Sequence, residues 1–111
     1  MEHRIQYLRE ANGHLIGCIA LKEHDLKGGF YSLVEYRVSV LNPEDQFDKG
    51  VARQLALGRL VEAPFTVRVP VHPTMHEVGA AIMKDIARDS DAPSRARKAA
   101  KLWIRDNTVT R

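Results

Sequence analysis

The chain has 111 residues, of which 44% are hydrophobic and 28% are charged, and its net charge is +3 at pH 7. These are values of a globular domain, so wholesale disorder is excluded, and the length suffices to bury a core without disulfides or metals. Cys18 is the single cysteine, which excludes an internal disulfide and favours a reducing compartment. No apolar run approaches the roughly 18 residues of a membrane span, and residues 1–10 lack a signal-peptide core. We therefore expect a cytoplasmic protein with no membrane partner.

Residues 4–10 and 14–22 are expected to form a β-hairpin. Asn12-Gly13 lies between them, and both residues tolerate the positive φ angles of a type I′ turn. The second of these strands, residues 14–22, is apolar on both faces, which is typical of a central strand in a sheet whose two faces are covered. Its two alternating sets of apolar residues are Leu15, Ile19 and Leu21 on one side, and Ile16, Cys18 and Ala20 on the other.

Two further strands are expected at residues 30–41 and 64–71. In the first, one face is apolar and the other is polar, which indicates a half-buried strand. The apolar set is Phe30, Val34, Tyr36, Val38 and Val40, and the polar set is Glu35, Arg37 and Ser39. In the second, Pro70 has no N–H to donate to a neighbouring strand, so this strand is expected at an edge of the sheet.

Between these strands, residues 42–60 indicate a helix. Asn42 suits the N-cap and Pro43 the first helical position, and two acidic residues follow at the positive end of the helix dipole. Gly50 and Gly58 each cost about 1 kcal/mol relative to alanine within a helix. We expect Gly58 to end the helix with a positive φ angle, because the next strand follows so closely.

The last third of the chain indicates two more helices. Thr74 and Glu77 form a capping box, and apolar residues then follow the 3.6-residue period to about Arg88. A basic helix is expected at about residues 93–106. The complete pattern, in the order βββαβαα, predicts a single α+β domain over residues 1–111, with a mainly antiparallel sheet of three or four strands and helices packed on it.

The final helix has two distinct faces. Its alanines and Trp103 fall within about a third of the circumference and suit close packing on a neighbour, so Trp103 should be largely buried. The opposite face, which we call the basic ridge, carries Arg97, Lys98, Lys101 and Arg105. A ridge of this kind suits phosphates or an acidic protein surface, and it is also compatible with an ordinary solvated face. No aromatic residues alternate with the basic ones, which disfavours stacking of single-stranded bases.

The sequence offers few catalytic or metal-binding groups. His72 and His76 have the i, i+4 spacing of a zinc pair, but Pro73 separates them and their order differs from H-E-x-x-H. Cys18 lies within an apolar strand, where burial would raise the pKa of its thiol and leave it unreactive. No nucleophile elbow and no phosphate-binding P-loop is present. We therefore expect no catalytic site, no metal and no cofactor.

Gly50 and Ala52 lie near the start of a helix that follows a long strand, and they give a first resemblance. They match the last two positions of the R/Q-x-x-G-x-G/A motif in the acetyl-coenzyme A core of the GCN5-related acetyltransferases. In that core, backbone N–H groups at a helix N-terminus hold the pyrophosphate. Phe47 stands where the motif has Arg or Gln, and Asp45 and Asp48 would place negative charge beside the diphosphate. The resemblance implies a reduced acyltransferase.

A second resemblance covers about the middle fifth of the chain. A strand ending in S-V-x-N-P-x-D is followed by F-D-K, a short helix and A-x-G-R-L. The matching residues are Ser39, Val40, Asn42, Pro43, Asp45, Phe47, Asp48, Lys49, Ala56, Gly58, Arg59 and Leu60. This pattern is similar to that of small uncharacterised proteins of tailed bacteriophages. The resemblance implies a phage-encoded protein in the cytoplasm of a bacterial host, which works by binding a host defence or regulatory complex, as anti-CRISPR inhibitors do.

Three hypotheses about function follow from these patterns. The first is a non-enzymatic binder of a host protein or protein–nucleic acid complex, and its contact residues would be the basic ridge together with Asp45, Asp48, Lys49 and Arg53. The second is an accessory protein that binds nucleic acid phosphates through the basic ridge. The third is the reduced acyltransferase.

Overall fold

Four antiparallel strands form one sheet in the order β1-β2-β3-β4, and three helices pack on it. The computed structural model describes residues 3–24, 29–41 and 48–107. The elements in chain order are β1 (Arg4–Arg9), β2 (Leu15–His24), β3 (Tyr31–Val40), α1 (Lys49–Glu62), β4 (Phe65–Pro70), α2 (Met75–Arg88) and α3 (Ser94–Asn107). This is the predicted α+β architecture with its elements in the predicted order.

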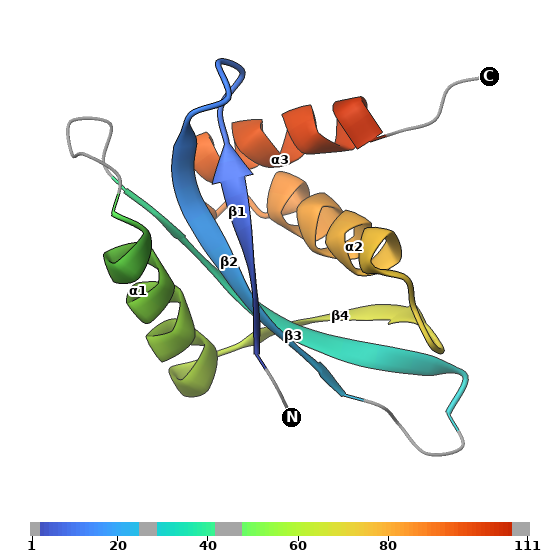
Figure 1. Cartoon of the computed structure of the whole chain (residues 1–111). Coiled ribbons are helices and arrows are strands. Elements are labelled where there is room, and N and C mark those ends of the chain that lie inside the picture. The colour runs from blue at the N-terminus through green and yellow to red at the C-terminus, as the bar shows by residue number, and fades with distance from the viewer. Residues whose placement is uncertain (1–2, 25–28, 42–47, 108–111) are drawn as a thin grey trace.

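The sheet is covered on both faces, as Figure 1 shows: α1 lies on one side, and α2 and α3 lie on the other. Strand β2 divides its apolar side chains between the two layers, as predicted. Cys18 and Ala20 pack with Ala52 and other residues of α1, whereas Ile19 and Leu21 belong to the larger core beneath α2 and α3. Burial on both faces explains why β2 is apolar along its length.

A β-bulge changes the direction of one predicted core residue. The register between β1 and β2 shifts between Leu8 and Arg9, because β2 has one extra residue, Ile16, at this point. The bulge turns Ile16 into the larger core, whereas strict alternation predicts that it packs with Cys18 and Ala20. The alternation rule fails here because it assumes a regular ladder.

The turn between β1 and β2 is also different from the predicted type I′ turn. Gly13 has a φ angle of 86°, but Asn12 does not have a positive φ angle, which a type I′ turn requires. The N–H of Gly13 donates to the carbonyl of Glu10 (2.9 Å), and the side chain of Asn12 accepts from the N–H of His14 (2.9 Å). The side-chain hydrogen bond stabilises Asn12 without a left-handed backbone.

Strand β3 is less exposed than the predicted half-buried strand. Val34, Tyr36 and Val38 lie in the larger core as expected, whereas Phe30, predicted on the same face, precedes β3 and is 97% exposed. Ser39, on the other face, is buried. The hydroxyl of Ser39 donates to the carbonyl of Ala52 (2.8 Å), so α1 both covers and satisfies it. The alternation of apolar and polar residues did not predict this burial, because serine is a polar residue and its acceptor lies on α1.

Helix α1 begins and ends at positions that differ from the prediction. Its N-cap is Asp48, whose side chain accepts from the N–H of Val51 (3.1 Å), while the predicted cap at residues 42–43 lies outside the described residues. Gly58 is inside the helix, without a positive φ angle, and α1 continues to Glu62. The added turn buries Leu60, and full burial of a leucine contributes about 1.5–3 kcal/mol, which exceeds the cost of one glycine.

Strand β4 and the start of α2 agree with the sequence patterns. Strand β4 is at an edge of the sheet, as Pro70 predicts. The capping box of Thr74 and Glu77 starts α2, with both reciprocal hydrogen bonds present. Trp103 of α3 is only partly buried, whereas the sequence predicted that it is largely buried. Its ring packs over Gly79, and it also contacts His76, an exposed residue whose ring stacks on it (centroids 5.6 Å apart).

Candidate functional site

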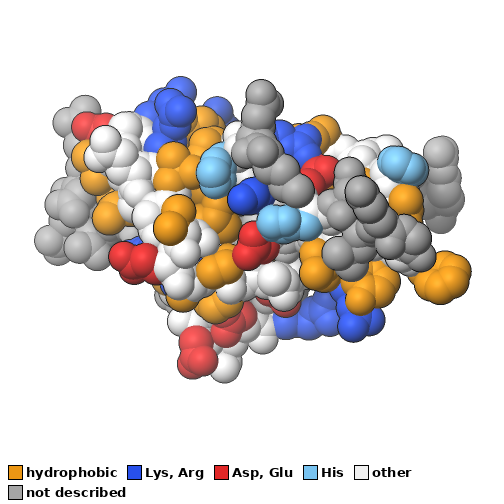
Figure 2. All heavy atoms as spheres, turned by 90° about the horizontal axis from the view of Figure 1, so that it is seen from below, with side chains coloured by type: hydrophobic (Ala, Val, Ile, Leu, Met, Phe, Trp, Pro, Cys, Tyr) orange, Lys and Arg blue, Asp and Glu red, His pale blue; other side chains and the backbone are white. Residues whose placement is uncertain are grey.

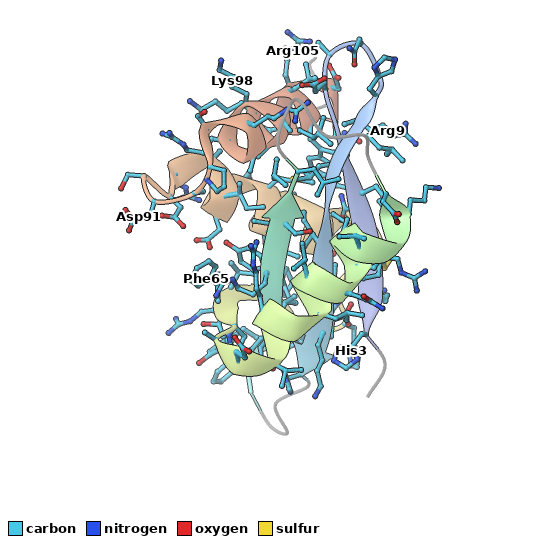
Figure 3. The ribbon with its side chains drawn as sticks, turned by 90° about the vertical axis from the view of Figure 1, so that its left-hand side faces the viewer. His3, Arg9, Phe65, Asp91, Lys98 and Arg105 are labelled. Carbon is cyan, nitrogen blue, oxygen red and sulfur yellow. The ribbon has the colours of Figure 1, made fainter. Side chains whose placement is uncertain are left out.

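The basic ridge lies on the outer side of α3, away from the sheet. Lys98, Lys101 and Arg105 are exposed, and in Figure 3 the labelled Lys98 and Arg105 project outward from the helix. Among the described residues, no carboxylate lies within salt-bridge distance of Lys98 or Lys101, and Arg105 pairs only with its neighbour Asp106 (3.4 Å). Two cations of the ridge therefore remain available to an external anion.

Arg97 differs from the other three residues of the ridge. The structure places it partly buried, and its Nε atom is enclosed without a hydrogen-bond partner among the described residues. The positions of these residues around the helix axis predicted four equivalent exposed cations. That prediction did not include the elements that pack beside α3. Arg97 is consequently less accessible than Lys98 and Lys101.

Arg95 connects α3 to the β1–β2 hairpin. Its guanidinium donates to the carboxylate of Glu10 from Nε (2.9 Å) and Nη2 (2.8 Å), and from Nη1 to the carbonyl of Leu41 (2.9 Å). Sequence reasoning did not select Arg95 or Glu10, which are 85 positions apart. Only the packing of α3 against the hairpin brings them together.

A pocket of about 480 Å³ opens beside this ion pair. Its lining is mostly apolar, with Ile16, Ala99 and Leu102, and Lys98 of the basic ridge also lines it. A second hollow, on the side of Trp103 and Arg105, shares Leu102 with the first. The ridge is therefore bordered at Lys98 by a pocket with a mostly apolar lining.

The second predicted contact group does not join the basic ridge. Asp48, Lys49 and Arg53 are on α1, on the opposite face of the sheet, and Asp45 lies outside the described residues. Asp48 is committed to capping α1, and the ammonium of Lys49 lies 5.1 Å from the centre of the Tyr7 ring. A single flat partner surface cannot contact both groups, since the sheet separates them.

Two buried side chains have altered acidities. Burial raises the pKa of the Cys18 thiol, although a contact with the Ser39 hydroxyl (3.8 Å) partly opposes the shift, as predicted for an unreactive thiol. Burial also raises the pKa of Tyr36, and the hydrogen bond that its hydroxyl donates to Asp85 adds to the shift. Neither group is activated as a nucleophile.

The two histidines considered as zinc ligands lie apart from any set of metal ligands. His72 is exposed with a φ angle of 54°, and His76 stacks on Trp103. Within the described part of the chain, no group of three or more His, Cys, Asp or Glu side chains is placed to hold a metal ion. The same residues include no helix that is long and apolar enough to cross a membrane.

Comparison with protein-family models, with curated proteins and with solved structures gave no match for this chain.

Proposed function

We propose that this protein is a non-enzymatic binding protein, and that its basic ridge docks on an acidic surface of a host protein or protein–nucleic acid complex. The observation that carries the proposal is the pair of exposed cations, Lys98 and Lys101, which have no carboxylate partner among the described residues. Lys98 also lines the mostly apolar pocket. Charges of this kind steer an acidic partner, and a bordering apolar surface adds contact area. The resemblance to small phage proteins suggests that the partner belongs to a bacterial host.

Nucleic acid is the alternative partner of the same ridge. A ridge that tracks phosphates needs cations alone, whereas this ridge is joined to the apolar side chains of Ile16, Ala99 and Leu102. Such a lining suits the side chains of a protein better than a sugar–phosphate backbone. We therefore favour a protein surface.

An acyltransferase receives less support from the start of α1. The N–H of Val51, one of the donors that a pyrophosphate would need, is bonded to the carboxylate of Asp48 (3.1 Å). That carboxylate would also repel a diphosphate placed at this helix N-terminus. The first turn of α1 is better explained as a capped helix than as an anion site.

The test is a comparison of two charge-reversed variants in a bacterial lysate. Lys98→Glu with Lys101→Glu removes the free cations of the ridge, while Lys84→Glu with Arg88→Glu makes the same change of net charge on exposed positions of α2. Protein captured by the wild type should be lost with the first variant and retained with the second, and added salt should weaken its capture.

Nuclease treatment separates the two kinds of partner. Capture that survives nuclease supports a protein surface, and capture that nuclease abolishes supports nucleic acid. If the folded ridge variant captures the same proteins as the wild type, the basic ridge is an ordinary solvated face.

A further inference from the structure

Two adjacent hollows lie between the β1–β2 hairpin and α3. The first is the pocket beside the Arg95–Glu10 ion pair, and the second, of about 430 Å³, lies on the side of Trp103. Both volumes are in the range of about 300–1,000 Å³ that is typical of ligand pockets. We call the two hollows together the hairpin groove. Four residues line both of them: Glu10, Ala11, Ala99 and Leu102.

The β-bulge in β2 supplies the base of the first hollow. It turns Ile16, which is 2% exposed, away from α1 and into the lining of this hollow. Bulges are frequent beside functional sites because they redirect a side chain. The N–H of Leu41 donates to the carbonyl of Ile16 (3.0 Å), and the carbonyl of Leu41 accepts from Arg95 (2.9 Å). The base and the wall are thus connected by hydrogen bonds, so the hollow is formed without a partner.

The charged residues of the hairpin groove leave an excess of positive charge. Its two carboxylates, Glu10 and Asp106, are each paired with an arginine of α3. Arg9 and Lys98 also line the groove, and neither has a carboxylate within salt-bridge distance among the described residues. Cations beside a mostly apolar hollow complement a ligand in which an apolar group lies next to carboxylates.

The basic side chains of the groove project from one end of the molecule. Figure 3 shows Arg9 on the hairpin, and Lys98 and Arg105 on α3, all at the top of the view. Figure 2 shows the opposite end from below, where acidic side chains lie among basic and hydrophobic ones. The field of the free cations therefore steers an acidic partner toward the end that contains the groove.

We propose that the hairpin groove binds an acidic segment of the partner protein, whose apolar side chain enters the hollow over Ile16 while flanking carboxylates pair with Lys98 and Arg9. This inference rests on the proposed function, because it specifies which part of an acidic partner the basic ridge contacts. An exposed ion pair at Lys98 contributes little by itself, so burial of the apolar side chain supplies most of the affinity. Lys101, which lies outside the groove, extends the basic surface beyond the size of a small ligand and favours a protein segment.

NMR titration of the isotope-labelled full chain with short blocked peptides tests the proposal. The probe has a central phenylalanine with two aspartates on each side, and it should bind with a dissociation constant below about 1 mM. The amide signals of Ile16, Ala99 and Leu102 should shift, and those of α1 should not. Alanine in place of the phenylalanine should weaken binding at least about tenfold, and lysines in place of the aspartates should abolish it. No binding of the first peptide, or equal binding of all three, overturns the proposal.

Phenylacetate tests whether the groove belongs to a small organic acid. It has the ring and one carboxylate of the probe but cannot reach Lys98 and Arg9 together, so it should bind at least about tenfold more weakly than the peptide. If phenylacetate binds as tightly as the peptide, a protein segment is the wrong ligand.

Two tryptophan substitutions locate the binding site. Ala11 is exposed in the hairpin turn and lines both hollows, so Ala11→Trp should fill the groove from its rim and weaken peptide binding at least about tenfold. Ser90→Trp adds the same side chain at an exposed turn outside the groove and should leave binding unchanged. Lys98→Glu, also at an exposed position, should weaken binding about fivefold. Equal affinities of the Ala11→Trp and Ser90→Trp variants would exclude the groove as the site.

Capture from a bacterial lysate separates a failure of this inference from a failure of the proposed function. If Lys98→Glu with Lys101→Glu loses the captured protein and Ala11→Trp retains it, the ridge binds without the groove, so this inference is wrong and the proposed function stands. If both variants retain the protein, both are wrong. Loss with each variant, together with the predicted order of the peptides, supports an acidic segment in the groove.

Discussion

Arg95 at the start of α3 forms a hydrogen-bonded ion pair with Glu10, which directly follows β1 in the turn of the β1–β2 hairpin. Both Nε and Nη2 of the guanidinium donate to one carboxylate oxygen. The third donor of Arg95 holds the carbonyl of Leu41 (2.9 Å), where β3 has ended. One side chain thus fixes three separate segments and positions the pocket beside the basic ridge. A planar guanidinium is needed for this arrangement, since an ammonium cannot donate in three fixed directions.

Arg95→Lys keeps the charge but loses this geometry. We expect it to lower the free energy of unfolding by about 1–2 kcal/mol, because Glu10 and the carbonyl of Leu41 lose partners in a partly buried site. Arg105→Lys, at a side chain that is 75% exposed, is the matched control and should change stability by less than about 0.5 kcal/mol. Urea denaturation of both variants measures the difference, and equal losses would show that the ion pair does not fasten α3.

The glycines of β2 and α1 should respond to alanine in opposite directions. A Cβ atom at Gly17 would lie 2.1 Å from the carbonyl oxygen of Ser39, so Gly17→Ala must displace β3 and should destabilise the fold by more than about 2 kcal/mol. Gly58→Ala meets no neighbour among the described residues and should stabilise the fold by about 1 kcal/mol. Thermal unfolding of both variants and the wild type checks both signs. A destabilised Gly58→Ala variant would contradict the position of Gly58 inside α1.

Trp103→Ala measures how firmly α3 is packed on α2. Since the ring is partly buried over Gly79, we expect a loss of about 2–3 kcal/mol, less than the roughly 3–5 kcal/mol of a fully buried aromatic residue. Trp103→Phe keeps part of the contact and should lose less. Denaturant unfolding gives both values, and a loss below about 1 kcal/mol for the alanine variant would mean that α3 is held by its alanines alone.

The buried hydroxyl of Tyr36 should make the protein sensitive to alkali. Its pKa is raised in the folded state by burial and by Asp85, so the folded protein holds this proton more tightly than the unfolded chain does. The resulting stability is present below the ordinary tyrosine pKa of about 10 and decreases as the pH rises above it.

Tyr36→Phe should remove this part of the pH dependence. The variant is expected to lose about 1–2 kcal/mol near pH 7, where the hydrogen bond to Asp85 is missing, and to decline less steeply above about pH 10. Tyr31→Phe, at a partly exposed ring, is the control and should decline as the wild type does. Free energies of unfolding measured from neutral to alkaline pH compare the three proteins. Parallel curves for Tyr36→Phe and the wild type would contradict the raised pKa.

Features that depend on contacts between neighbouring residues could be predicted from the amino-acid sequence. The capping box of Thr74 and Glu77, the apolar period of α2 and the edge position of β4 at Pro70 were all predicted, because each follows from contacts or missing donors within a few residues. The apolar alternation of β2 also predicted a central strand, since residues on both of its faces must be buried. The order of the elements followed from these local signals.

Features that depend on residues far apart in the chain could not be predicted in this way. Gly58 stays inside α1 because Leu60 is buried against the sheet, and Ser39 is buried because α1 supplies an acceptor for its hydroxyl. The candidate site has the same origin: the basic residues of α3 were visible in sequence, but the apolar pocket beside them exists only where α3 meets the hairpin held by Arg95. A local pattern specifies which face of a helix or strand is apolar. The free energy of burial depends on what covers that face, so it comes from contacts between segments far apart in the chain.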